Sequence, residues 1–251
     1  MKAVIMSVTH KEYWMPEDKL YLPIQVGFSD DLGIQRDNEG ENISSKNKNY
    51  CELTALYWGW KNLDADVIGL DHYRRHFSLK QFGKKKERIL TYKELLKLME
   101  THDILLPKKR HYWIETNKSQ YLHAHHAEDL TVLEQVLEEK YPQMMKFYER
   151  EMNKTSGHRF NMMIMKRECF NRYCSFLFDV LFEVEKRLDV SDYSDYDARV
   201  FGFLSERLID VWIASEKIKS YDITYVFMEK QNWIKKGINF ILRKFGGVQI
   251  E

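Results

Sequence analysis

Short apolar runs alternate with longer amphipathic stretches along the chain. The short runs predict strands at residues 3–8, 21–26, 65–70, 103–106, 161–165 and 221–227. The first of them is rich in β-branched residues, which favours a buried strand there, although six apolar residues alone also fit a helix. Apolar positions that recur at helical spacing predict helices at residues 50–61, 92–99, 130–139, 142–151, 170–184 and 200–213. The strand, helix, strand order through residue 70 favours an α/β fold with a mostly parallel central sheet flanked by helices.

The polar segment 28–48 separates the second predicted strand from the first predicted helix. It is rich in Asn, Asp and Gly, so we expect a loop, and a loop of this length is often functional. Asn42, Lys46 and Asn47 lie just before the helix, where hydrogen-bonding side chains suit an anionic or sugar ligand. The alternative is a solvated turn with a Ser cap. The segment lacks the P-loop and GxGxxG patterns, so ATPase and dinucleotide-dehydrogenase functions have no support.

The run Asp71–His76 (DHYRRH) directly follows the predicted strand 65–70. Ligands of parallel α/β sheets bind beyond the carboxyl ends of the strands, so chemistry is expected at this run. The adjacent Arg74 and Arg75 suit a diphosphate, because guanidinium groups bind phosphate oxygens through paired hydrogen bonds. Asp71 suits a cation that bridges the diphosphate, or a substrate hydroxyl. A solvated strand end with local ion pairs is the alternative.

Glu206 lies on an otherwise apolar predicted helix. A carboxylate in apolar surroundings suits a general base. The alternative is an ion pair on the helix surface with Arg207 or Arg199.

Two further groupings carry weaker signals. Asp64 and Asp66 form a DxD string, but they precede the strand, so we expect only a turn at the edge opposite the ligands. His123, His125 and His126 invite a metal hypothesis, yet the sequence has no HExxH pattern there, and a solvated segment is the favoured interpretation.

Composition limits the function classes and the compartment. In 251 residues, 39 Lys and Arg almost cancel 38 Asp and Glu, so no nucleic-acid partner is expected. Cys51, Cys169 and Cys174 form no CxxC pair, so we expect neither a disulfide framework nor a thiolate zinc site. No apolar run approaches about 20 residues, so no bilayer-spanning helix is expected, and the chain reads as a soluble protein of a reducing compartment.

Residues 230–251 form a basic extension behind a single predicted domain at residues 1–229. The extension combines Lys and Arg with Trp, Ile and Phe, which is typical of an amphipathic helix at a membrane surface. The alternative is a terminal helix that docks on the domain.

Several long motifs in this sequence resemble one family of enzymes. The most extensive are DNEGENISSKNKNYCELTALYWGWKN at residues 37–62 and VIGLDHYRRHF at residues 67–77. Others are PIQVG, LLPKKRHYWIET, HRFNMMIMKRECFNRYCSFLFDVLFEVE, RVFGFLSERLIDVW and NWIKK. Over nearly its whole length the chain resembles bacterial capsular and exopolysaccharide glycosyltransferases, a family long catalogued as a domain of unknown function that includes galactofuranosyltransferases.

The resemblance implies a GT-A-like nucleotide-sugar-binding fold. It implies transfer of a sugar, galactofuranose first, from a UDP-sugar to a lipid-linked oligosaccharide at the cytoplasmic face of the membrane. The residues expected to bind the donor are Thr9, His10, Asn42, Lys46, Asn47, His72, Tyr73, Arg74 and Arg75. His158, Asn161 and the histidines at 123–126 are expected on the acceptor side. Glu206 first, and Asp71 second, would accept the proton of the acceptor hydroxyl if the reaction inverts the anomeric centre.

The sequence after the strand at residues 65–70 bears on metal dependence. In the GT-A fold a metal-binding DxD follows the strand that here ends at Leu70, whereas this sequence has Asp71-His72-Tyr73 and lacks the second carboxylate. Members of the resembled family often carry Cys rather than Asp at the position of Asp71. Asp71 is therefore the only candidate ligand for a Mn²⁺ or Mg²⁺ ion. If no metal ion binds, Arg74, Arg75 and His72 would neutralise the diphosphate. The rival function is a non-catalytic carbohydrate-binding or assembly subunit on a decayed transferase scaffold.

Overall fold

The structure, a computed structural model, describes residues 1–27 and 30–229. A central sheet contains β1 (Ala3–Thr9), β2 (Tyr21–Gln25), β3 (Gln35–Arg36), β4 (Val67–His72), β5 (Arg75–Ser78), β6 (Ile104–Pro107), β9 (Met163–Lys166) and β10 (Ser220–Phe227). A separate two-stranded sheet pairs β7 (Arg110–His111) with β8 (Ser156–Gly157). The predicted C-terminal extension, residues 230–251, lies outside the described residues.

The central sheet is mixed, so the prediction of a mostly parallel sheet is wrong. Its order is β3-β2-β1-β4-β5-β10-β6-β9, with a further pairing of β4 with β9. The β1–β2, β1–β4, β2–β3 and β6–β10 pairs are parallel. The β4–β5, β4–β9, β5–β10 and β6–β9 pairs are antiparallel. The reversal arises because β5 follows β4 through a tight turn at Tyr73 and Arg74, and a tight turn joins only antiparallel strands.

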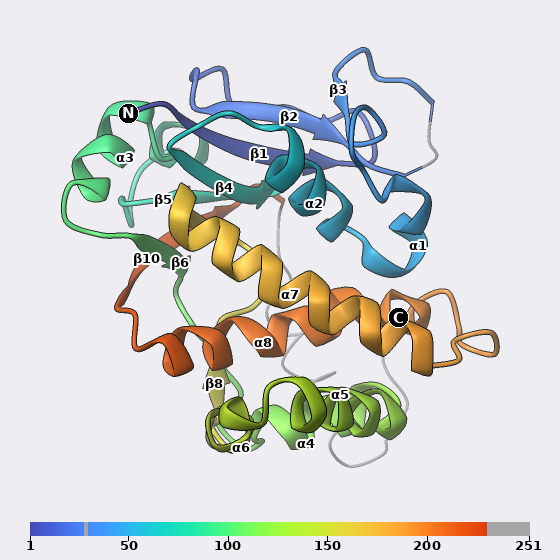
Figure 1. Cartoon of the computed structure of the whole chain (residues 1–251). Coiled ribbons are helices and arrows are strands. Elements are labelled where there is room, and N and C mark those ends of the chain that lie inside the picture. The colour runs from blue at the N-terminus through green and yellow to red at the C-terminus, as the bar shows by residue number, and fades with distance from the viewer. Residues whose placement is uncertain (28–29, 230–251) are drawn as a thin grey trace.

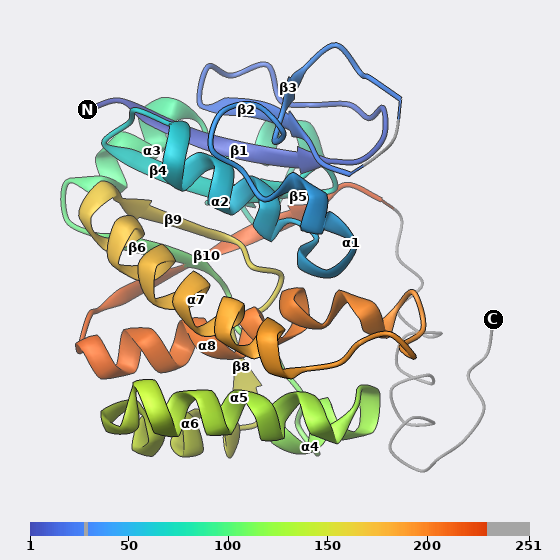
Figure 2. The same cartoon turned by 45° about the vertical axis from the view of Figure 1, so that its right-hand side comes forward.

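Helices cover both faces of the sheet and form a further layer (Figures 1 and 2). The α-helices are α1 (Asn47–Tyr50), α2 (Leu53–Asn62), α3 (Tyr92–Met99), α4 (Asn117–Ala124), α5 (Ala127–Lys140), α6 (Met145–Met152), α7 (Arg167–Arg187) and α8 (Val200–Glu216). The 3-10 turns are η1 (Ser44–Lys46), η2 (Lys85–Arg88), η3 (Pro142–Met144) and η4 (Asp197–Arg199). In both views α7 and α8 lie between the sheet and the layer of α4, α5 and α6.

Alternation along β1 divides the hydrophobic core into two clusters. Ile5 packs with α3 residues such as Leu95, whereas Met6 packs on the opposite face with α2 and α7. Successive side chains of a strand point to opposite faces, so an apolar run such as β1 is buried on both sides. At Gly69 in β4, a Cβ would lie 2.9 Å from side-chain atoms of both Ile5 and Ile164, so the close packing of β1, β4 and β9 requires glycine there.

The helix predicted at residues 50–61 is interrupted in the structure. Cys51 adopts φ 50° and ψ −127°, which ends α1 and lets α2 begin at Leu53. A positive φ at a residue other than Gly or Asn is uncommon, so composition gave no signal for this break.

The remaining predicted helices and strands are present, with small shifts at their ends. The Asp64-Asp66 string precedes β4, and the Asp66 carboxylate accepts a hydrogen bond from the Lys2 backbone N–H (2.7 Å), as expected for a turn at the amino edge of the sheet. Within the described part of the chain, no helix combines the length and apolarity needed to cross a bilayer.

Candidate functional site

The β4–β5 turn brings basic side chains to the carboxyl ends of β1 and β4. The Tyr73 backbone N–H donates to the Val8 carbonyl oxygen (3.0 Å), which holds the turn beside the end of β1. His10 lies edge-on to the Tyr73 ring, with 5.5 Å between ring centroids. Burial and the neighbouring charges of Lys11, Arg74 and Arg199 lower the pKa of His10 from its ordinary value. Three cationic side chains therefore surround an imidazole that stays neutral at pH 7.

We name Arg74, Arg75 and Arg199 the arginine cluster. The Arg75 guanidinium lies over the rings of Phe160 (4.4 Å) and Phe227 (4.9 Å). Burial, and then repulsion from Arg74, lower the pKa of Arg75 from its ordinary value. Arg74 is more exposed and lies 3.7 Å from the Glu229 carboxylate. Like charges held together without full compensation favour an anionic ligand between them.

Arg199 joins the cluster from η4, whereas the sequence suggested it only as a pairing partner of Glu206. Its Nε instead lies 3.2 Å from the Cys51 sulfur, at the break between α1 and α2. Burial, and then the charge of Glu52, raise the pKa of Cys51 to about 11, so it is a thiol rather than a thiolate at neutral pH. The strained backbone at Cys51 thus positions Arg199 beside His10 and Glu52.

Two carboxylates, Glu52 and Glu206, act electrostatically on Arg75. Glu206 accepts a hydrogen bond from the Phe160 backbone N–H (2.7 Å) and another from Arg207 (3.1 Å). A pair with Arg207 therefore exists, but it is not the surface pair expected, because Arg207 is buried; the same carboxylate also acts on Arg75 of the arginine cluster. Glu52, which sequence analysis missed, accepts a hydrogen bond from the Asn161 side chain (2.7 Å). In the sequence, Glu52 is an inconspicuous residue near the start of a predicted helix. The break at Cys51, visible only in the structure, places its side chain next to Asn161.

Phe160 and Asn161 form a strained link between β8 and β9. Their φ angles are 76° and 52°, a region that costs backbone energy for residues other than glycine. The Asn161 amide donates to Glu52 and to the Gly202 carbonyl (3.1 Å), and its oxygen accepts from the Ser205 hydroxyl (2.7 Å). Asn161 is buried and fully engaged in this junction, so it positions the site rather than offering a free group to an acceptor.

Most of the expected donor residues from the N-terminal third have structural partners. The Thr9 hydroxyl donates to the Lys11 carbonyl (2.5 Å), and the Asn42 amide donates to the Gly40 carbonyl (2.8 Å). Lys46 pairs with Glu185 of α7 (2.6 Å), away from the strand ends. Asn47 donates to the Cys51 carbonyl (2.8 Å), which supports the break between α1 and α2. Within this group, His10 packs against Tyr73 of the β4–β5 turn, next to Arg74 and Arg75.

His72 links the turn to the strained segment. Its Nε2 lies 2.6 Å from the Phe160 carbonyl oxygen, so the ring nitrogen donates there. Tyr73 is buried and packs its ring against His10 and Tyr13. Both residues therefore shape the floor of the site between β4 and β9.

Asp71 does not fit the role of metal ligand or catalytic base. Its side chain is fully buried, one carboxylate oxygen accepts from the Ser7 hydroxyl (2.6 Å), and the other lies 2.9 Å from His76 Nδ1. Both oxygens thus serve contacts inside the protein, between β1, β4 and β5. The described residues also include no group of three or more His, Cys, Asp and Glu placed to hold a metal ion. The Asp71 carboxylate, committed to Ser7 and His76, does not fit a site for Mn²⁺ or Mg²⁺.

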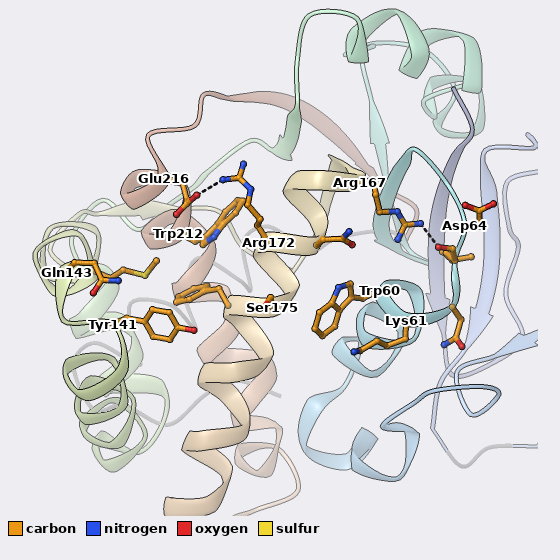
Figure 3. A pocket seen from close by; sticks show the side chains of 15 residues that line it. Trp60, Lys61, Asp64, Tyr141, Gln143, Arg167, Arg172, Ser175, Trp212 and Glu216 are labelled. Atoms are coloured by element: carbon orange, nitrogen blue, oxygen red, sulfur yellow. Dashed lines mark hydrogen bonds and ion pairs between the residues drawn. The ribbon is translucent and has the colours of Figure 1, made fainter.

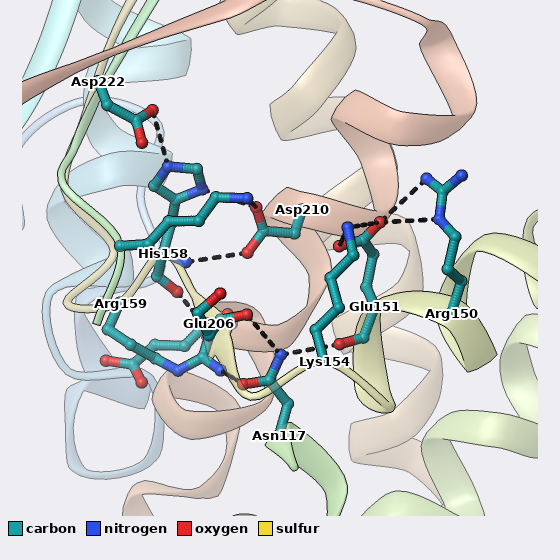
Figure 4. A network of polar contacts seen from close by, with 11 residues as sticks. Asn117, Arg150, Glu151, Lys154, His158, Arg159, Glu206, Asp210 and Asp222 are labelled. Atoms are coloured by element: carbon teal, nitrogen blue, oxygen red, sulfur yellow. Dashed lines mark hydrogen bonds and ion pairs between the residues drawn. The ribbon is translucent and has the colours of Figure 1, made fainter. Parts of the chain in front are cut away.

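His158 lies in an internal charge network (Figure 4). Its Nδ1 is 2.6 Å from an Asp210 carboxylate oxygen and its Nε2 is 3.0 Å from an Asp222 oxygen. Burial alone would lower the pKa of His158, but hydrogen bonds to the two carboxylates raise it above its ordinary value. Lys109 lies 3.6 Å from Asp210 on the same side. His158 is 3% exposed, so the expectation that it binds an acceptor is wrong, and its role is to join α8 to β10.

A cavity of about 180 Å³ opens beside the arginine cluster. It is lined by Arg110, Tyr112, Glu115, Gln120, His123, Ala124, His125, Arg159, Phe160, Tyr196, Phe203, Glu206 and Arg207. Phe160 and Glu206 belong both to this cavity and to the surroundings of Arg75. His125 stacks on Phe203 with 4.2 Å between ring centroids, and Arg199 lies 5.5 Å from the same Phe203 ring. We name this space the aromatic pocket.

The aromatic pocket shows what the histidine-rich segment does. His125 lies against an aromatic wall, and His123 pairs with Glu115 at the rim. Aromatic faces, a carboxylate and an amide around a small cavity suit a sugar ring, whose faces are apolar and whose edge carries hydroxyls. These histidines are therefore placed as pocket walls rather than as a metal site.

A larger cavity of about 990 Å³ lies elsewhere, between α2, α7 and the end of α8 (Figure 3). It is reached from the amino end of β4, where Asp64 lies, and Trp60 and Trp212 contribute to its walls. Arg172 pairs there with Glu216 (2.6 Å). None of the residues of the arginine cluster lines it. The smaller aromatic pocket is the better candidate because charge, a carboxylate and a cavity meet there.

Comparisons with known proteins agree with this geometry. The chain is similar to the solved structure of WbbM, a bifunctional glycosyltransferase in its apo form, with a TM-score of 0.85 and 27% sequence identity. The similarity covers 92% of this chain and 46% of that one, so this chain spans about half the length of that neighbour. The comparison with curated proteins gives no match. The mixed α/β architecture is thus that of a glycosyltransferase-related protein.

The family comparison covers most of the chain. A family described as a domain of unknown function (DUF4422) matches residues 4–217, which include the arginine cluster, Glu52, Asn161 and Glu206. Because this match spans well over half of the sequence, the chain belongs to the DUF4422 family, whose fold is here related to that of a glycosyltransferase.

Proposed function

We propose that this protein is a glycosyltransferase that moves a sugar from a UDP-sugar to a saccharide acceptor. The observation that carries the proposal is the meeting of the arginine cluster with the aromatic pocket at Glu206. A nucleotide-sugar donor needs cationic groups for its diphosphate, and an acceptor sugar needs a cavity next to them. The similarity to a solved glycosyltransferase supports the same reaction class.

The donor diphosphate is assigned to the arginine cluster. Arg75 is largely shielded from water by Phe160 and Phe227, so its charge is screened less than that of an exposed arginine. Arg199 and Arg74 add charge from two other directions. Hydrogen bonds from guanidinium groups to phosphate oxygens supply the neutralisation that a divalent ion supplies in other enzymes.

The acceptor sugar is assigned to the aromatic pocket, with Glu206 as general base. The acceptor hydroxyl oxygen forms a bond to the anomeric carbon as the bond from that carbon to the β-phosphate oxygen breaks. The bonding electrons leave with UDP, and the hydroxyl proton passes to the Glu206 carboxylate. The Phe160 N–H and Arg207 hold that carboxylate at the boundary between the two sites.

The finer specificity rests on the resemblance of the sequence motifs. They support galactofuranose as the sugar and a lipid-linked oligosaccharide as the acceptor, at the cytoplasmic face of a membrane. The basic segment 230–251, assigned to membrane contact, lies outside the described residues.

The proposal is tested by a donor screen. Purified protein is incubated with a panel of UDP-sugars, including UDP-galactofuranose, and a matching acceptor, and released UDP is measured. Calorimetry with UDP alone runs in parallel. UDP binding with turnover for one donor supports the proposal. Absence of both UDP binding and turnover would contradict it, and retained saccharide binding in that case would favour the non-catalytic carbohydrate-binding function.

A further inference from the structure

The segment 108–114 exposes an aromatic side chain next to a basic run. Trp113 is 81% exposed, which is unusual for so large an apolar side chain, and Ile114 beside it is 51% exposed. Lys108, Arg110 and His111 precede them and are also exposed. The stretch from Ile104 to Ile114 contains no acidic residue. An exposed tryptophan and uncompensated basic residues thus lie together on one short segment.

The backbone holds Trp113 in this position. Its φ angle is 59°, in the left-handed region that bulky residues rarely adopt. On one side, β7 pairs with β8 through Arg110 and Gly157. Between them, the buried Tyr112 donates its backbone N–H to the Thr155 carbonyl (2.8 Å), and its hydroxyl accepts from Arg159 (3.0 Å). The exposed ring is therefore the product of an anchored turn rather than of a loose loop end.

The chemistry of this segment matches an anionic membrane surface. Tryptophan is enriched at the membrane–water interface because its ring is apolar and its indole N–H is polar. Basic residues near an anionic bilayer gain attraction from the surface potential. Within the segment Lys109 pairs with Asp210 (3.6 Å), which leaves Lys108 and Arg110 as the exposed cations.

A second exposed aromatic offers a natural comparison. Phe82 is 88% exposed and precedes the basic run Lys84–Lys86. There, however, the cations are used inside the protein: Lys84 lies 3.6 Å from the Glu87 carboxylate, and Lys85 donates to the Met228 carbonyl (3.0 Å). Lys86 lies over the Trp14 ring (4.3 Å). In the Trp113 segment Arg110 likewise lies over the Tyr112 ring (5.4 Å), so the exposed Lys108 is the cation that distinguishes it from the segment at Phe82.

We propose that residues 108–114 form a membrane-contact loop that inserts Trp113 into the interfacial region of an anionic bilayer. Arg110 and Tyr112 of this loop also line the aromatic pocket. Contact through Trp113 would therefore place the pocket beside the bilayer surface, where the saccharide end of a lipid-linked acceptor is found. The last step rests on the proposed function, whereas the contact itself does not.

The first test locates the inserted side chain by fluorescence. The full chain is mixed with vesicles of phosphatidylcholine and phosphatidylglycerol whose acyl chains carry bromine, which quenches nearby tryptophan. We expect quenching in the wild type and in Trp233→Phe, and clearly weaker quenching in Trp113→Phe, where only a contribution from the C-terminal segment can remain. Quenching that survives in Trp113→Phe but disappears in Trp233→Phe would overturn the proposal and assign the contact to the C-terminal segment.

The second test measures vesicle affinity by co-sedimentation. Trp113→Ala should weaken binding several-fold and Lys108→Glu by about five-fold or more, while Phe82→Ala and Lys84→Glu stay near the wild type. Circular dichroism checks that each variant is folded. Equal affinity of the Trp113 and Phe82 variants, or no binding of the wild type to anionic vesicles, would overturn the proposal, and the latter would leave a protein partner as the occupant.

Transfer to a short water-soluble acceptor separates this proposal from the proposed function. Trp113→Ala should keep that activity because its side chain does not line the aromatic pocket. If the wild type binds vesicles through Trp113 but transfers no sugar, the glycosyltransferase assignment fails and the membrane contact stands.

Discussion

The Glu206 carboxylate accepts a hydrogen bond from the backbone N–H of Phe160 at 2.7 Å. The ring of the same Phe160 lies under the Arg75 guanidinium, 4.4 Å away. One residue therefore holds both the carboxylate assigned to proton transfer and the cation assigned to the leaving group. Phe160 has a strained backbone conformation with a φ of 76°, so the position of this shared contact depends on the strained segment between β8 and β9.

Replacing Glu206 by Gln should lower the turnover number by about 10²–10⁴-fold, because the amide keeps the shape but cannot accept a proton. UDP affinity should stay close to that of the wild type, since the arginine cluster is unchanged. Steady-state UDP release and calorimetry measure the two quantities. Glu216→Gln, at the far end of the same helix, is the matched control. A Glu206→Gln enzyme within a few-fold of the wild type would transfer the role to Glu52.

Replacing Arg75 by Ala should weaken UDP binding by about 1.5–3 kcal/mol, the range for hydrogen bonds to charged groups. Arg199→Ala should have a similar effect, and Arg74→Ala a smaller one, because Arg74 is more exposed and lies near Glu229. Arg172→Ala removes an arginine that pairs with Glu216 outside the site and should leave UDP binding unchanged. Donor affinity unaltered in all cluster variants, with folding intact, would remove the diphosphate from this position.

Activity should persist in excess EDTA. The physical reason is that the Asp71 carboxylate is fully buried and both of its oxygens already contact Ser7 and His76 inside the protein. UDP release is compared before and after chelation, and after addition of Mn²⁺ or Mg²⁺. Complete loss with EDTA and recovery with either ion would mean that Asp71 leaves its buried position when the donor binds.

The stability of the fold should depend on pH through His158. Its pKa in the folded protein is raised by Asp210 and Asp222, so its stabilising contribution is fully present below its ordinary value of 6.5 and is lost as the pH rises through the folded value. Asp210 behaves in the opposite way: its pKa is lowered to about 2, so its contribution is present above its ordinary value of 3.8 and is lost in strong acid.

Urea unfolding at about pH 5.5 and about pH 9 measures this dependence. The wild type should lose stability at the higher pH, and His158→Gln should lose less between the two conditions. His102→Gln, which removes a partly buried imidazole stacked on Tyr221, serves as the control. An equal pH dependence in the wild type and His158→Gln would show that the charge network does not govern it.

The spacing of apolar residues was enough to locate most strands and helices. An element such as β1 or α7 buries its apolar residues in a pattern that is already visible within its own stretch of sequence. The relative direction of neighbouring strands was harder to predict from the sequence. The expectation of a mostly parallel sheet overlooked the turn at Tyr73 and Arg74, where no Gly or Pro signals the reversal that begins β5.

The candidate site was predictable only in part. The arginines after β4 and the carboxylate at Glu206 were identified because their residue types stand out in an apolar context. Glu52 was missed because its partner Asn161 lies 109 positions away in the chain, a proximity that no local pattern encodes. Asp71 and His158 were misassigned for the opposite reason: their residue types suggest chemistry, whereas their burial commits them to internal contacts.

The junction at Asn161 constrains how this family can vary. A single buried amide there satisfies Glu52, the Gly202 carbonyl and the Ser205 hydroxyl, and a buried polar group without a partner costs about 1–3 kcal/mol. A change at Glu52, Asn161 or Ser205 would therefore leave a buried polar group of the junction without its hydrogen-bond partner. Across related sequences these three positions should be inherited as one unit, retained together or replaced together, even where the neighbouring surface drifts freely.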